Sequence, residues 1–222
     1  MNKIPTLEEL GISSSDEEIE VKTKDDECEE ILEAMWMGEI SLREGEEKLN
    51  EMIQNSEVTP ETFDESGRNL LHNAAINAKF IDTYETEKRN WFKGFIRRLI
   101  KDEGYDPNTR TKDFEKKTVL FFFISNSRVE HFWYTFMKEL IEEHGADPLL
   151  TIEYDDDDDD LEMNLRQYID FRWNLPSKVK DTSDTRREVT VKPFLDYLKA
   201  YELRKTGLIK PTFWSVQPSL KL

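Results

Sequence analysis

The chain has 222 residues, of which 37% are hydrophobic and 36% are charged, and its formal net charge is −17 at pH 7. This length allows one substantial core or a short array of repeats, and the hydrophobic share is sufficient for a folded interior under a highly charged surface. Such an acidic chain repels nucleic acid and anionic lipid, whose binding depends on Lys and Arg contacts to phosphate, so basic proteins or peptides are the more natural partners.

Targeting and redox signals indicate an intracellular protein. No apolar run approaches the roughly 20 residues that a membrane helix needs, so no membrane association is expected. The first ten residues lack the long apolar stretch of a secretory signal. A single cysteine, Cys28, excludes an internal disulfide framework and fits a reducing compartment. We therefore expect a cytoplasmic or nuclear location.

The negative charge is concentrated at the N-terminus. Residues 1–66 carry 5 basic and 21 acidic residues, residues 67–160 carry 14 and 20, and residues 161–222 carry 12 and 7, giving net charges of −16, −6 and +5. We expect residues 1–24 to form an acidic, disordered leader. Ser13, Ser14 and Ser15 each have an acid three residues later, which resembles the pattern of acid-directed kinases; a solubilising tail is the alternative.

Residues 25–58 are predicted to form a pair of helices. In the first, Ile31, Leu32, Met35 and Trp36 recur with helical spacing. The second helix is expected to begin at Ser41, where the sequence S-L-R-E predicts a capping box between Ser41 and Glu44. Its apolar stripe comprises Leu42, Leu49, Met52 and Ile53.

The most informative segment is D-E-S-G-R-N-L-L-H-N-A-A at residues 64–75. It resembles the opening of an ankyrin repeat, in which a D-x-x-G turn leads into T-P-L-H-x-A-A; the matching residues are Asp64, Gly67, Leu71, His72, Ala74 and Ala75. Asn69 stands where threonine is usual and can serve equally as a helix N-cap. Leu70 replaces the proline that presets the first helical φ.

Two later segments resemble the end of such a repeat. They are L-I-K-D-E-G-Y-D-P-N-T-R at 99–110 and L-I-E-E-H-G-A-D-P-L-L at 140–150. Gly104 and Gly145 can end a helix in the left-handed conformation, and Pro107 and Pro148 cannot continue it. Helices are predicted at 69–79, 118–126, 130–144, 165–173 and 191–207, and across an amphipathic stripe from Trp91 to Ile100 after a polar break at 83–89.

The resemblance implies an all-α fold, a short ankyrin-like solenoid of about three divergent repeats at 59–207 with residues 25–58 as helical N-terminal cap. The repeat openings lie 49 and 45 residues apart, whereas 33 is usual in the family. Six aspartates at 155–160 form an acidic insert, for which a disordered loop is expected, with a clamp for a basic segment as the alternative. A calcium loop is disfavoured because Leu161 replaces the turn glycine.

No nucleotide-binding, hydrolase or zinc-protease motif is present, and none of the three histidines has metal-ligand spacing to Cys or another His. We therefore expect no enzyme, no cofactor and no metal. The resemblance gives His72 a hydrogen-bonding role between neighbouring turns.

Ankyrin repeats bind proteins through finger tips and the concave inner-helix face. The function expected is an intracellular adaptor or inhibitor, with an acidic chaperone or decoy for basic proteins such as histones as the alternative. Phe114 is the first contact candidate, because an aromatic between charges at a finger tip has no obvious core to join. The other contact candidates are Asn77, Arg110, Lys112, Asp113, Ser125 and Asn126, together with Asp155, Asp156, Asp157, Asp158, Asp159 and Asp160. The tail at 208–222 is expected to cap the last repeat or to dock elsewhere.

Overall fold

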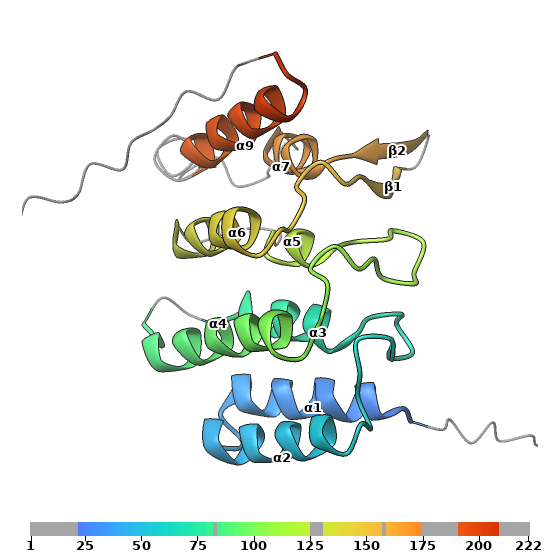
Figure 1. Cartoon of the computed structure of the whole chain (residues 1–222), viewed down its shortest axis with the longest axis vertical. Coiled ribbons are helices and arrows are strands. Elements are labelled where there is room, and N and C mark those ends of the chain that lie inside the picture. The colour runs from blue at the N-terminus through green and yellow to red at the C-terminus, as the bar shows by residue number, and fades with distance from the viewer. Residues whose placement is uncertain (1–21, 82–83, 125–130, 157–158, 175–190, 209–222) are drawn as a thin grey trace, which may run out of the picture.

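The computed structural model describes residues 22–81, 84–124, 131–156, 159–174 and 191–208. Within these ranges the chain is mostly helical, with one two-stranded hairpin, and the helices stack in successive pairs along the longest axis (Figure 1). No helix in the described ranges is both long enough and apolar enough to cross a membrane. The elements are α1 Lys24–Met37, α2 Leu42–Gln54, α3 Leu70–Ala78, α4 Thr86–Lys101, α5 Val119–Phe122, α6 His131–Glu143, β1 Ile152–Asp156, β2 Asp159–Met163, α7 Leu165–Asn174 and α9 Lys192–Lys205.

The helix ends follow the chemistry of the sequence. Asn69 caps α3 by accepting a hydrogen bond from the His72 amide at 3.2 Å. Ser41 caps α2 through the Glu44 amide, while the Glu44 carboxylate pairs with Lys48 at 3.0 Å. The three glycines expected in turns and helix ends all have positive φ: Gly67, Gly104 and Gly145 at 73°, 77° and 74°.

Helix α3 lies at the centre of the first half of the molecule. It packs against α1, α4 and α5, and eight of its nine residues are buried. Its two alanines, Ala74 and Ala75, are fully buried and let neighbouring helices approach closely. Aromatic residues replace such small residues in the next layer, where the Phe123 and Trp133 rings lie 5.1 Å apart and the Tyr134 and Phe194 rings 4.7 Å apart.

Four expectations need correction. The fold is not all-α, because the aspartate segment pairs as β1 and β2, with Asp155 opposite Asp160. Lys24 belongs to α1 rather than to the leader, since Thr23 and Asp26 form a capping box around the helix start. Helix α4 begins at Thr86, inside the expected polar break, and α5 spans only Val119–Phe122. Lys22 and Thr23 of the expected leader are also described, whereas residues 1–21 and the tail beyond 208 lie outside the described residues.

Candidate functional site

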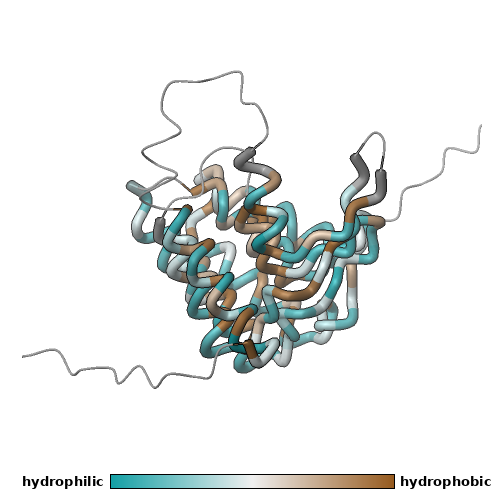
Figure 2. The backbone as a smooth tube through the Cα atoms, turned by 90° about the horizontal axis from the view of Figure 1, so that it is seen from above, coloured by the Kyte–Doolittle hydropathy of each residue, from teal (hydrophilic) through white to brown (hydrophobic). Residues whose placement is uncertain are grey.

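Three loops gather on one side of the helices, as the view down the stack shows (Figure 2). We call them fingers 1, 2 and 3, at residues 59–68, 106–117 and 147–163, and together the finger row. Each finger connects the end of one helix pair to the first helix of the next. The finger row is therefore the face where backbone from every layer meets.

Backbone hydrogen bonds join each finger to the next. The Lys112 amide donates to the Gly67 carbonyl at 2.7 Å, which ties finger 2 to finger 1. The Glu153 amide donates to the Glu115 carbonyl at 3.1 Å, which ties finger 3 to finger 2. Arg110 adds a bond from Nη1 to the Thr151 carbonyl at 2.6 Å. These cross-links make the row a continuous surface instead of three independent loops.

Further hydrogen bonds join finger 2 to the turn at the start of finger 3 and to α3. Asn108 accepts from the Asp147 amide at 2.7 Å and donates to the Gly145 carbonyl at 3.0 Å. His72 accepts from the Asn69 amide at Nδ1, so its proton is on Nε2, which donates to the Thr109 carbonyl at 3.0 Å. Burial lowers the pKa of His72 to about 4. The predicted role of His72 as a hydrogen-bonding residue between neighbouring turns is confirmed.

Finger 2 holds the leading contact candidates. Asp113 Oδ1 accepts from Thr111 Oγ1 at 2.7 Å and from the Lys116 amide at 3.0 Å, which closes the tip of the loop. Lys112 is exposed, and its Nζ lies 3.7 Å from the centroid of the Phe63 ring. Phe114 follows Lys112 and precedes Lys116 in the sequence, and its side chain is 62% exposed. The tip therefore presents an aromatic ring on a loop that its own hydrogen bonds hold in place.

The other candidates are distributed differently. Asn77 is only 5% exposed, and its amide donates to the Asn73 carbonyl at 3.0 Å, so it offers almost no surface to a partner. Ser125, Asn126, Asp157 and Asp158 lie outside the described residues. The remaining aspartates, at 155, 156, 159 and 160, form the end of the hairpin in finger 3. The disordered loop expected for these four is wrong.

An exposed apolar group that the sequence did not reveal lies where α1 and α3 end. Phe80 and Met37 are each 50% exposed, and the rings of Phe80 and Trp36 lie 5.3 Å apart. Tyr84, just before α4, is 94% exposed. No sequence pattern separated these residues from core residues, because Met37 ends α1 and Phe80 and Tyr84 lie in the connection between α3 and α4, where no helical periodicity applies.

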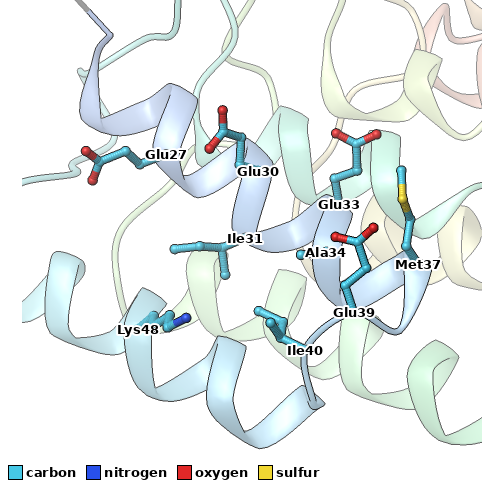
Figure 3. Close-up of a pocket in the computed structure, with 9 residues that line it drawn as sticks. All are labelled: Glu27, Glu30, Ile31, Glu33, Ala34, Met37, Glu39, Ile40 and Lys48. Atoms are coloured by element: carbon cyan, nitrogen blue, oxygen red, sulfur yellow. The ribbon is translucent and has the colours of Figure 1, made fainter.

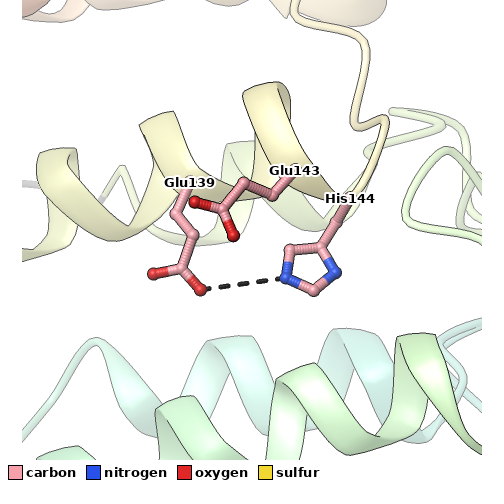
Figure 4. Close-up of side chains that lie close together, drawn as sticks. All are labelled: Glu139, Glu143 and His144. Carbon is pink, nitrogen blue, oxygen red and sulfur yellow. Dashed lines mark ion pairs between the residues drawn. The ribbon is translucent and has the colours of Figure 1, made fainter. Parts of the chain in front are cut away.

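Within the described residues, two side-chain clusters have the composition of metal ligands. In the first, donor atoms of Glu139, Glu143 and His144 lie within 4.8 Å of one another, and His144 Nε2 is 3.8 Å from Glu139 Oε1 (Figure 4). Arg97, however, donates to both carboxylate oxygens of Glu139, at 2.5 and 2.8 Å. Burial and the nearby Lys101 also lower the pKa of His144. Arg97 already neutralises the Glu139 carboxylate through two hydrogen bonds, so the cluster is better explained as an ion pair than as a metal site.

The second cluster comprises Asp26, Glu29 and Asp64 at the base of finger 1. Arg68 bridges two of these acids, donating to Asp64 at 3.1 Å and to Glu29 at 2.9 Å. Asp64 accepts further bonds from the Arg68 amide and from Asn73. The carboxylates are thus engaged in holding the D-x-x-G turn against α1, which is a structural role.

The finger row presents an exposed aromatic, Phe114, on a loop that its own hydrogen bonds hold in place. Comparison of the chain with models of known protein families, with characterised proteins and with solved structures finds no match for any part of it.

Proposed function

We propose that this chain is a short, divergent ankyrin-like solenoid of about three repeats, with α1 and α2 as its N-terminal cap, and that it acts without catalysis by binding a protein partner. The support is the order of helix pair, glycine-ended turn and finger, together with the bonds from Gly67 to Lys112 and from Glu115 to Glu153 that connect successive fingers. A stack of this kind presents an extended surface on which many partners can be recognised. The proposed role is an intracellular adaptor or inhibitor.

The observation that carries this proposal is Phe114. Phe114 is 62% exposed, so in the free protein most of its ring is not stabilised by burial. The ring also lies on a loop whose conformation is fixed by the hydrogen bonds that Asp113 accepts. Exposed aromatics on preorganised loops are typical binding hot spots, because they bury a large area at a small cost in conformational entropy. Lys112, also exposed on the same tip, would supply a charged contact beside the ring.

We expect Phe114→Ser to abolish most partner binding while leaving the fold intact. The removal of a hot-spot ring should weaken binding at least about ten-fold. Quantitative affinity capture from native extract, with wild-type and variant chains as baits and thermal melting as a check on folding, measures this effect.

The matched control is Tyr84→Ser, which removes an even more exposed aromatic, 94% against 62%, from outside the finger row. A partner retained by Tyr84→Ser and lost with Phe114→Ser supports the finger row. Retention of every captured protein by Phe114→Ser would refute it.

A second candidate function is an acidic chaperone or decoy for basic proteins. It is favoured by the register of the hairpin in finger 3, where Asp155 lies opposite Asp160 and Asp156 opposite Asp159. Like charges at opposite positions destabilise a strand pair, and a bound cationic segment would relieve that repulsion. Such binding should lose most of its affinity between low and physiological ionic strength, whereas binding centred on Phe114 should change little.

A further inference from the structure

A groove runs between α1 and α2, in the pair that forms one end of the described stack (Figure 3). Its volume is about 580 Å³. The residues of α1 that line it lie on the side of the helix away from Cys28, Leu32 and Met35, which are fully buried, and α1 packs against α3. The groove therefore lies on a helix face that no other described layer covers.

The middle of the groove is apolar. Ile31 and Ala34 contribute from α1 and Ile40 from the loop before α2, and each remains only partly buried. Met37 extends this surface at one end, where half of its side chain is exposed. Unbranched methionine adapts its shape to different partners, which suits an apolar binding surface. The floor of the groove can thus accept an apolar side chain.

Acidic side chains surround this floor. Four glutamates line the groove, namely Glu27, Glu30, Glu33 and Glu39, against one lysine, Lys48. Lys24 pairs with Glu27, Lys22 pairs with Glu30, and Lys48 itself pairs with Glu44.

Glu33 and Glu39 have no ion-pair partner within the described part of the chain, and both lie at the Met37 end of the groove, as Figure 3 shows. A cation placed beside Met37 would meet two carboxylates that form no ion pair within the described ranges.

We propose that this groove binds a basic amphipathic helix of another protein, with apolar residues on the floor and Lys or Arg between Glu33 and Glu39. A groove between two helices accepts the ridge of a third, and an amphipathic helix presents such a ridge at positions i, i+3, i+4 and i+7. Charge disfavours two of the occupants that the chain itself could supply. Residues 1–21 contain one lysine and six acids, a net charge of −5, and a second copy of the chain carries −17.

The test uses the full-length chain and a labelled probe peptide of about 14 residues, the length of α1, with Leu at the ridge positions and Lys elsewhere. Fluorescence anisotropy near physiological ionic strength gives its affinity. Glu33→Gln/Glu39→Gln should weaken binding about five-fold, since each exposed ion pair contributes modestly. Met37→Gln should also weaken it, by about three-fold, because the floor loses an apolar contact.

The matched control is Glu47→Gln/Glu51→Gln, which removes the same charge from exposed positions of α2 outside the groove. Its affinity should stay close to that of the wild type. Equal loss in the two double variants would overturn the proposal, because the peptide would then follow overall charge. An unchanged affinity in Met37→Gln would overturn it as well. Phe114→Ser should leave peptide binding unaltered, so this result is independent of the finger row.

Discussion

Gly67→Ala should lower the free energy of unfolding by about 3 kcal/mol, the sum of backbone strain and overpacking. Gly67 has a φ of 73°, a conformation that side chains rarely adopt. A Cβ there would also lie 2.9 Å from the Asp113 amide nitrogen and 3.0 Å from the Lys112 carbonyl carbon, which are backbone atoms of finger 2. Either the turn or the next finger must move. Urea denaturation measures the loss.

Gly104→Ala is the matched control for this experiment. Gly104 has a φ of 77°, but a Cβ at that position would meet nothing within 4 Å. The control should therefore lose only the cost of the left-handed conformation, about 1 to 2 kcal/mol. The difference between the two variants isolates the contact between fingers 1 and 2. Equal losses would contradict a tightly packed finger row.

Asp25→Asn should change how stability depends on pH. Burial, with smaller contributions from the nearby Asp64 and Asp26, raises the pKa of Asp25 to about 6. A raised carboxyl pKa means that the folded state binds the proton more tightly than the unfolded state, so Asp25 stabilises the fold less as pH rises from about 4 to about 6. Relative to the wild type, the variant should gain about 3 kcal/mol of stability over this interval. Urea denaturation of both chains from about pH 4 to pH 8 tests this expectation.

His72 acts in the opposite direction. Its folded pKa of about 4 is depressed by burial, so the unfolded state takes up a proton first, and stability is lost as pH falls from about 6.5 to about 4. Protonation would also place a hydrogen on Nδ1, which now accepts from the Asn69 amide. In the wild type the two groups offset each other, and Asp25→Asn should expose the full acid sensitivity of His72. If stability depends on pH in the same way in the two chains, the folded-state pKa of Asp25 is not raised, and the prediction is wrong.

Local sequence chemistry predicted the helices and turns well. The glycines and prolines near 104–107 and 145–148 identify helix ends, because only a few residue types can adopt those backbone conformations. The segment from Asp64 to Ala75 predicted both the turn and the start of α3 at Asn69. The exposure of Phe114 was also predictable, since its charged neighbours leave it no apolar stripe to join.

Features that depend on packing between distant segments were not predictable. Asn77 is polar and seemed suited to a surface, yet α1, α4 and α5 all pack around α3 and bury it. The repulsion between neighbouring aspartates seemed to exclude a strand. In the structure, however, Ile152 pairs with Met163 and Tyr154 with Leu161, and the strand pairing that begins at these residues continues into the acidic segment. The groove between α1 and α2 likewise depends on how two helices meet.

Site-specific photocrosslinking tests the proposed binding surface most directly. A benzophenone amino acid would replace Phe114 in one full-length chain and Tyr84 in a second, each irradiated in native extract. Crosslinking of one defined protein to position 114, and not to position 84, is the result expected if finger 2 carries the contact. Crosslinks to that protein at position 84 alone, or no crosslink at position 114 with the partner still bound, would contradict the account.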